Sequence, residues 1–260
     1  MKNIADLVNY AWHSHRTCLS YDFTVKKSIP ILYFGDLEAY SKSQRKIITV
    51  GLNPSRQEFP QENPYYRFPL VKTSLSYFDE TSFPSFGANE ESIQSYLAAL
   101  NMYFKHKPYE WFNCYEPILQ GMNCSYYGEP QENTAIHTDI CSPIATDPTW
   151  SGLSKTERQS LEVDGIKLWH DLIECVQPDV VIISVAKEHL EKINFQCLSP
   201  WQNHEVVARQ NPFSIKMRQL KVGLTKSTLV FGQAAQQPFG TVSSVDKKSI
   251  GKYIAECLAI

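Results

Sequence analysis

Short apolar runs rich in β-branched residues alternate along this chain with segments whose apolar residues recur every three or four positions. The first pattern is typical of buried strands, and the second of amphipathic helices. Strands are predicted at 29–34, 47–50, 135–140, 180–185 and 227–232, and helices around 93–104, 156–176 and 250–258. Gln177-Pro178 ends the helix at 156–176, and the strand DVVIIS follows directly, so this part is predicted to be an αβ unit.

This alternation predicts the α/β class, with a single domain and a mainly parallel central sheet flanked by helices. A chain of 260 residues with 43% hydrophobic content can bury one large core, and it shows no internal repeat or low-complexity linker. We therefore expect one domain over 1–260, with an N-terminal extension over 1–45 and a helical insertion over 70–130. Ligands of such sheets bind at the carboxyl ends of the strands.

Neither an export signal nor a membrane anchor is expected. The stretch MKNIADLVNYAWHSH carries acid and histidine where a secretory peptide needs a basic start and an apolar run, and no stretch approaches membrane-spanning length. The seven cysteines form no C-x-x-C pair, and their odd number argues against a full disulfide framework. We expect a cytoplasmic protein with reduced thiols and no membrane partner.

Charge is distributed unevenly along the chain. The formal net charge of −2 argues against a nucleic-acid-binding protein, yet residues 201–260 hold eight Lys and Arg against three acids, so they carry +5 and the remainder carries −7. This distribution allows a basic face opposite an acidic one. Lysines scattered over the surface explain it equally well, and both interpretations stay open.

The stretch GLNPSRQEFPQENPYYRFP follows the strand at 47–50. Asn53 lies just past the strand end, and the ring of Pro54 restricts its backbone to extended angles. Its carboxamide is therefore expected to project from the ligand-binding edge of the sheet in a fixed direction, with an ordinary Asn-Pro turn as the alternative. The aromatics of Phe59-Pro60 and NPYYRFP favour a pocket, because stiff rings near one polar group suit a flat ligand.

This arrangement resembles the first motif of the uracil-DNA glycosylase superfamily, especially its mismatch-specific branch, where strand-GINPG is followed by a phenylalanine-proline step and P-x-N-R-F. IHTDICSPIATDPTW, at 136–150, is similar to the segment of the single-strand-selective branch that reads the flipped base. QPDVVIISVAKEHLEKINF is similar to the family's third strand and its helix. STLVFGQAAQQPFGTVSS resembles the last strand and the minor-groove loop. The resemblance spans about 47–258.

The resemblance implies a monofunctional DNA glycosylase, a monomer that flips a nucleotide and hydrolyses its N-glycosidic bond without a metal or an organic cofactor. Asn53 falls where the family holds the hydrolytic water. A positioned water suffices, because the base is already leaving in an oxocarbenium-like transition state. Gly51 would let the backbone approach the ligand, Pro54 would fix the loop, and Ser55 would bond a phosphate or the base. Ordinary turn chemistry is the alternative for Gly51 and Ser55.

The resemblance also implies a ring that stacks on the flipped base. Phe59 is expected in this role, with Tyr65 or Tyr66 behind it. Strict alignment on N-P-x-x-R-F instead puts Gln61 at the family's phenylalanine position. The choice of the stacking residue is therefore open among the aromatics of this stretch.

In the stretch that resembles the minor-groove loop, Gln237 stands at the family's His/Asn position, where it would donate to a base carbonyl or a phosphate. Phe239, Gly240, Thr241 and Val242 replace the family's S-G-L-S. Phe239 or Val242 would be the apolar wedge that fills the hole left by a flipped nucleotide. For Phe239, a buried loop aromatic is an equal alternative.

Asp139 is the departure from the family pattern that bears most on the substrate. A uracil reader offers Asn there, whereas a carboxyl group accepts from the N4 amine of cytosine and, if burial keeps it protonated, donates to N3. The alternatives are that Asp139 caps the next helix or pairs with Arg67 or Arg209. We expect a modified cytosine, because excising normal cytosine would destroy the host genome. The hydroxymethyl and glucosylated cytosines of viral DNA then suggest antiviral defence.

Three other functions fit the sequence. One is a plain uracil or mismatch DNA glycosylase, and another is a non-catalytic nucleic-acid-binding relative, since the motifs depart from the family at Gln61 and Gln237. The third is a metal-assisted hydrolase in which His137 and Asp139, two positions apart on a strand, are metal ligands. The sequence contains no P-loop, G-x-G-x-x-G or G-x-S-x-G motif.

Overall fold

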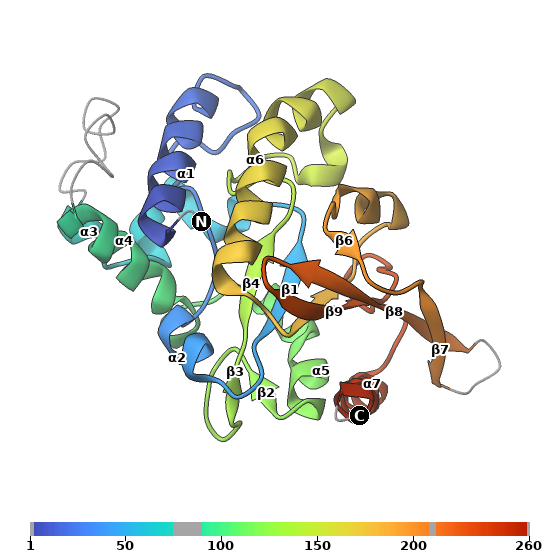
Figure 1. Ribbon diagram of the computed structural model, residues 1–260. Coiled ribbons are helices and arrows are strands. Elements are labelled where there is room, and N and C mark those ends of the chain that lie inside the picture. Colours follow the sequence, from blue (N-terminus) through green and yellow to red (C-terminus); the bar gives the residue numbers. More distant parts are fainter. Residues whose placement is uncertain (1–2, 75–89, 208–211, 259–260) are drawn as a thin grey trace. The chain divides into compact units, whose positions relative to one another are not determined.

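A sheet of seven strands organises the computed structural model, which describes residues 3–74, 90–207 and 212–258 (Figure 1). The strand order is β4-β1-β5-β9-β8-β6, and β7 also pairs with β8. A separate parallel pair joins β2 (Cys124–Ser125) to β3 (Asn133–Thr134). The strands of the large sheet are β1 (Ile47–Gly51), β4 (Ile136–Asp139), β5 (Val180–Ile183), β6 (Gln196–Cys197), β7 (Gln202–Val207), β8 (Phe213–Val222) and β9 (Thr225–Phe231).

The parallel strands at the centre of the sheet are uniformly apolar. β1 pairs with β5 and β5 with β9 in parallel, so that Ile48 lies opposite Val181 and Val181 opposite Leu229. Every residue of β1 and β5 is buried, as expected for strands covered on both faces. The expected α/β class, a single domain whose mainly parallel central sheet is flanked by helices, is confirmed.

Helices and short 3-10 turns connect the strands. The α-helices are α1 (Ile4–Cys18), α2 (Leu37–Lys42), α3 (Val71–Ser74), α4 (Glu90–Asn101), α5 (Glu116–Gly121), α6 (Lys155–Val176) and α7 (Ser244–Leu258). The 3-10 turns are η1 (Arg56–Glu58), η2 (Pro60–Glu62), η3 (Pro64–Tyr66), η5 (Tyr103–Lys105), η6 (Glu110–Cys114), η7 (Trp150–Gly152) and η8 (Lys187–Lys192). The helices expected at 156–176 and 250–258 correspond to α6 and to the second half of α7.

Contacts group the chain into two compact units, each assembled from segments far apart in the sequence. Unit 1 comprises residues 1–35, 52–109 and 138–175, and unit 2 comprises residues 36–51, 110–137 and 176–260. Unit 1 contains α1, α3, α4 and nearly all of α6. Unit 2 contains β1, β5 to β9, and the helices α2, α5 and α7.

In unit 2, α5 and α7 approach each other closely because two glycines lie where they meet. A Cβ on Gly251 would lie 2.0 Å from the carbonyl oxygen of Ile118, and one on Gly121 would lie 2.2 Å from that of Lys248. Any larger residue at either position would push the helices apart. This close packing holds α7 against α5.

In unit 1, α1 contributes to the core. Asn3 caps the helix: its side chain accepts from the N–H of Asp6, and the Asp6 side chain accepts from the N–H of Asn3. Trp12 is fully buried and contacts the ring of Tyr96 edge-on, with the ring centres 5.7 Å apart. Residues 1–45, expected as an N-terminal extension, therefore include a helix of the unit 1 core.

The segment at 29–34 is buried, but the prediction of a strand there is wrong. The N–H of Ile31 donates to the carbonyl of Pro143 at 2.8 Å, and that of Leu32 donates to the hydroxyl of Tyr96 at 3.2 Å. The same hydroxyl donates to the carbonyl of Pro30 at 2.8 Å. These bonds satisfy polar groups of the buried backbone without a neighbouring strand.

The expected insertion at 70–130 contains α3, α4 and α5, and its residues 75–89 lie outside the described residues. Among the helices that are described, none has the length and apolar character to cross a membrane. All seven cysteines are free thiols. Burial raises the pKa of the Cys18 thiol to about 11, so this thiol stays protonated at neutral pH.

Candidate functional site

The loop that follows β1 is tied through its main chain to the segment that follows Asp139. The N–H of Cys141 donates to the carbonyl of Leu52 at 2.8 Å, and the N–H of Thr146 donates to the carbonyl of Pro54 at 3.2 Å. The first two motifs of the proposed site are distant in the sequence and lie side by side in unit 1.

Asn53 holds its carboxamide in one orientation. Its Nδ2 donates to the carbonyls of Pro54 at 2.7 Å and Ile144 at 3.2 Å, and to the hydroxyl of Thr146 at 2.9 Å. Two of these partners are carbonyls, which can only accept, so the amide cannot be flipped without losing both bonds. Its Oδ1 has no hydrogen-bond partner among the described residues. Asn53 is half-buried, and Oδ1 is therefore the atom it offers to a ligand or a water.

Asp139 is half-buried at the carboxyl end of β4, and α6 anchors the residues on either side of it. The indole N–H of Trp169 donates to the hydroxyl of Thr138 at 3.0 Å. On the other side, a Cβ on Gly165 would lie 2.0 Å from the carbonyl oxygen of Cys141, so this glycine allows α6 to approach the main chain. The backbone that carries Asp139 is thus fixed by a helix of the same unit.

Neither structural alternative for Asp139 is supported by the described residues. The next helical turn after it, η7, begins only at Trp150, so Asp139 does not cap a helix. Arg67 pairs with Glu58, its Nε lying 3.7 Å from Glu58 Oε2. Arg209 lies outside the described residues.

Glu58, the last residue of η1, was not anticipated from the sequence and is buried, with 3% of its surface exposed. The hydroxyl of Tyr103 donates to Oε2 of Glu58 at 2.5 Å. Burial raises the pKa of Glu58 to about 7; the Tyr103 bond and the charge of Arg67 oppose this rise, and the charge of Asp139 adds to it. A buried carboxyl group that titrates near neutral pH is typical of functional sites.

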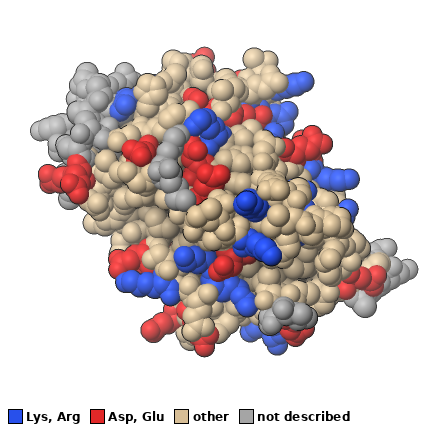
Figure 2. Space-filling model, in the orientation of Figure 1, with Lys and Arg blue, Asp and Glu red and all other residues tan. Residues whose placement is uncertain are grey.

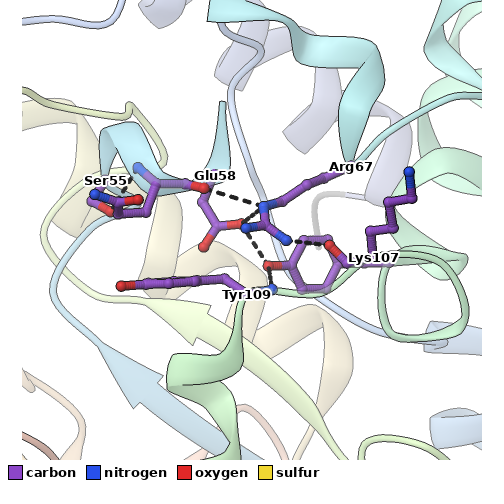
Figure 3. A network of polar contacts seen from close by, with 7 residues as sticks. Ser55, Glu58, Arg67, Lys107 and Tyr109 are labelled. Atoms are coloured by element: carbon purple, nitrogen blue, oxygen red, sulfur yellow. Dashed lines mark hydrogen bonds and ion pairs between the residues drawn. The ribbon is translucent and has the colours of Figure 1, made fainter. Parts of the chain in front are cut away.

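Arg67 links three parts of this region, as Figure 3 shows. Its Nε donates to the carbonyl of Gln57 at 3.1 Å, and Nη1 donates to the carbonyl of Lys107. The guanidinium carbon lies 5.8 Å from the ring centre of Tyr66 and 5.5 Å from that of Tyr109. The arginine of the N-P-x-x-R-F pattern therefore holds the loop around Glu58 together.

The structure distinguishes the three aromatics expected near the base. Phe59 is fully buried, and its ring stacks on Phe68 with the ring centres 6.0 Å apart. Neither face of Phe59 is open to a base in this structure, because the turn from η1 to η2 directs the ring into the core. Tyr65 is half-buried. Tyr66 is 41% exposed, and the ammonium of Lys107 lies 4.7 Å from its ring centre.

Three further residues of the first motif have local roles. Gly51 is the buried last residue of β1, and Pro54 is buried in the loop beyond it. The hydroxyl of Ser55 accepts from the N–H of Gln57 at 3.2 Å and caps η1. The turn-chemistry alternative for Ser55 is thus what the structure shows, although its hydroxyl hydrogen is not used in that bond.

The loop at 233–243 belongs to unit 2 and is anchored by Phe239. This residue has a φ of 51°, and its N–H donates to the hydroxyl of Ser184 at 2.9 Å. Its ring is fully buried and occupies the space beside Gly232, where a Cβ would lie 2.1 Å from Cε1. Phe239 is therefore the buried loop aromatic of the second alternative, and it is not available as a wedge.

Other side chains of this loop face solvent. Gln237 and Thr241 are exposed, whereas Val242 is buried. The main chain of Gln237 is fixed, since its N–H donates to the carbonyl of Ala235 at 2.7 Å. The loop thus presents polar side chains from a backbone that is held in place.

The basic stretch at 201–260 is not a uniform surface. Lys247 is buried, and its ammonium donates to the carbonyls of Cys114 and Pro238, both at 3.0 Å. Burial lowers the pKa of Lys247. The expectation that this lysine faces DNA is wrong, while Lys248 and Lys252 are exposed. Figure 2 shows Lys and Arg interspersed with Asp and Glu on the face in view.

His137 is buried in unit 2 and has a structural environment. Its Nδ1 lies 2.7 Å from the hydroxyl of Thr49, and its ring contacts Phe112 and Trp111 at centre distances of 5.0 and 5.6 Å. Over the described ranges, no three His, Cys, Asp or Glu residues come together in a way that could hold a metal ion. The metal-ligand interpretation of H-x-D therefore gains no further ligand there.

No protein-family model and no curated protein matches this sequence. The resemblance to the uracil-DNA glycosylase superfamily is therefore a hypothesis that rests on the motifs themselves. The α/β fold is compatible with it, and a fold alone does not identify an activity. What the structure adds is the local geometry of Asn53, Asp139 and Glu58.

Proposed function

We propose that this protein is a monofunctional DNA glycosylase that flips a nucleotide, hydrolyses its N-glycosidic bond and leaves an abasic site. The observation that carries the proposal is the orientation of Asn53. Its amide nitrogen is committed to three acceptors, and its Oδ1 has no bond to any described residue, beside the segment that follows Asp139. An oxygen held in this way can accept a hydrogen bond from one water and fix where that water lies.

The reaction needs little more than that from Asn53. In hydrolysis of an N-glycosidic bond, positive charge develops on the sugar as the base departs, so a weakly activated water can attack C1′. An amide is not a base at neutral pH, but positioning and electrostatic stabilisation contribute several powers of ten to a rate. The water oxygen bonds to C1′, and the bonding electrons of C1′–N1 leave with the base.

Asp139 reads the base in this proposal. One carboxyl oxygen accepts from the N4 amine of a cytosine, and the protonated oxygen donates to N3. Uracil has a carbonyl and an N–H at these positions and fits less well. Because unmodified cytosine is abundant in any genome, the substrate carries a group at C5, such as the hydroxymethyl or glucosyl groups of viral DNA. The protein then acts in the cytoplasm as a defence enzyme.

The exposed ring of Tyr66 is the best available stacking platform in unit 1. Its neighbour Lys107 adds a positive charge that suits a phosphate backbone. Gln237 and Thr241, exposed on their own loop, supply polar groups for DNA in unit 2. The buried rings of Phe59 and Phe239 support the two loops and do not contact the ligand.

A screen of labelled oligonucleotides tests the proposal. Single- and double-stranded substrates would carry cytosine, 5-hydroxymethylcytosine, its glucosylated form, uracil, or a G·T mismatch, and alkali would cleave any abasic site formed. We expect cleavage with a modified cytosine, none with cytosine, and unchanged activity in a metal chelator. Release of uracil alone would indicate a plain uracil glycosylase. Binding of DNA without release of any base would indicate a non-catalytic relative.

A further inference from the structure

Glu58 is a buried titratable group that the positioning of water by Asn53 does not require. It lies five positions after Asn53 on η1 and belongs to the same unit as Asp139. A buried carboxylate is costly unless it is paired and hydrogen-bonded, so its partners determine when it carries a proton. Those partners are Tyr103, Arg67 and Asp139.

The hydrogen bonds of Tyr103 assign a role to each oxygen of Glu58. The hydroxyl of Tyr103 accepts from the N–H of Tyr109 at 3.0 Å, and its own hydrogen points to Oε2 of Glu58 at 2.5 Å. Oε2 is therefore an acceptor in this arrangement. When Glu58 is protonated, the proton sits on Oε1.

Arg67 compensates the charge of Glu58 only in part. The single hydrogen on its Nε is donated to the carbonyl of Gln57, so the ion pair to Glu58 is long, at 3.7 Å (Figure 3). The charge of Asp139 acts in the opposite direction to that of Arg67. Two carboxyl groups that interact in a buried setting do not both ionise readily, and they titrate as a pair.

We propose that Glu58 and Asp139 share one proton near neutral pH, and that Asp139 delivers this proton to N3 of the flipped base. The inference rests on the proposed glycosylase function and deepens it, because it makes protonation of a cytosine-type base part of the reaction. Asp139 touches the base, and Glu58 is a positioning residue that keeps the proton available.

The step is balanced. As the C1′–N1 bond breaks, its electron pair moves to the base, which takes the proton at N3 and leaves as a neutral molecule. Water held by Asn53 forms the new bond to C1′, and the proton that it loses returns to the carboxyl pair. A cytosine needs this help more than a uracil does, because its anion is the poorer leaving group.

The test is a single-turnover pH–rate profile from pH 5.5 to pH 8.5 on the preferred modified base, for the wild-type protein and two variants. Glu58→Gln removes the second carboxyl group, so we expect the alkaline limb to move down by at least one pH unit. The ratio of wild-type to variant rate then grows about tenfold or more between pH 5.5 and pH 7.5. Tyr103→Phe removes the donor that stabilises the Glu58 anion, so its limb moves up.

Opposite shifts in the two variants are the signature of a shared proton, since a purely structural defect lowers the rate by the same factor at every pH. Glu62→Gln, an exposed acid in the neighbouring turn, is the matched control and should leave the profile unchanged. If Glu58→Gln does not fold, the Tyr103→Phe profile and a carboxyl titration of the substrate-free wild-type protein by ¹³C NMR still decide. The wild type should show a carboxyl group that titrates near pH 7.

The outcomes separate the two proposals. An active wild-type enzyme whose profile is unaltered by both variants would overturn the shared proton and leave the glycosylase function standing. A wild-type protein that releases no base at any pH would overturn the function, and with it the delivery of a proton to the base. A titration that finds no carboxyl group ionising near neutral pH would overturn the shared proton whatever the activity.

Discussion

The amide nitrogen of Asn53 lies 2.9 Å from the hydroxyl oxygen of Thr146, and the amide donates. Thr146 stands in the segment that follows Asp139, and its N–H donates to the carbonyl of Pro54. The side chain and the main chain of one threonine thus hold the loop of the proposed water-binding residue. Function at this site depends on the orientation of Asn53 as well as on its presence.

Asn53→Ala is expected to slow base release by about 10²- to 10³-fold, because the variant loses the acceptor that positions the water. Affinity for DNA should stay close to that of the wild type, since the carboxamide is half-buried and bonded mainly to protein. Single-turnover rates and fluorescence anisotropy measure the two quantities. Thr146→Val, which removes one of three acceptors, should give a smaller loss. Wild-type rates in Asn53→Ala would refute the assignment.

Asp139→Asn is expected to shift preference from cytosine-type to uracil-type bases. A carboxamide donates to O4 and accepts from N3–H, whereas a carboxyl group is matched to N4 and N3 of cytosine. Competition between two oligonucleotides that differ only in the target base measures the ratio of rates. Equal loss of activity on both bases would mean that Asp139 does not read the Watson–Crick edge.

The fold was predictable where the sequence pattern was long and regular. The helix expected at 156–176 is observed as α6 over Lys155–Val176, and DVVIIS forms β5. The segment at 29–34 has the same apolar character but forms no strand, because its backbone bonds to Pro143 and Tyr96. β8 was not anticipated, although its alternate residues from Phe213 to Met217 are buried as in a half-covered strand. Apolar composition indicates burial, and the bonding partner decides the structure.

The site was less predictable, because loop side chains take their direction from tertiary contacts. The position of Asn53 followed from the strand end and Pro54. The burial of Phe59 and Phe239 did not, since an aromatic in a loop can face a ligand or the core equally well. Glu58 gave only a weak signal, an acid directly before the Phe-Pro step. Its raised pKa comes from burial and from Asp139, which lies far away in the sequence.

Lys247 and Lys248 are adjacent, and their substitutions should have different consequences. Lys247→Met leaves the carbonyls of Cys114 and Pro238 without their donor, so it should lower the free energy of unfolding by about 1–3 kcal/mol. The salt dependence of DNA binding should not change. Lys248→Ala with Lys252→Ala should leave stability unchanged and flatten the log–log salt slope on duplex DNA by about 0.9 for each phosphate that the protein no longer neutralises.

Chemical denaturation and binding titrations at several salt concentrations separate the two effects. An unchanged slope in the Lys248→Ala, Lys252→Ala variant would place the DNA elsewhere on the protein. A flatter slope in Lys247→Met would mean that this ammonium reaches DNA after all. Either result would change which lysines of the basic stretch are assigned to binding.

Glu58 should make the protein less stable as the pH rises. Burial raises its pKa in the folded state from 4.5 to about 7, so between these values the folded state binds more protons than the unfolded state, and stability falls as the pH increases. The full difference corresponds to about 3 kcal/mol, present below pH 4.5 and lost above pH 7. Urea unfolding of the wild type and Glu58→Gln at pH 5 and pH 8 measures it. The variant should lack most of this pH dependence, while the exposed control Glu62→Gln should keep it. If wild type and Glu58→Gln lose stability equally between the two pH values, Glu58 is already ionised at pH 5, and the shared proton is excluded without any measurement of activity.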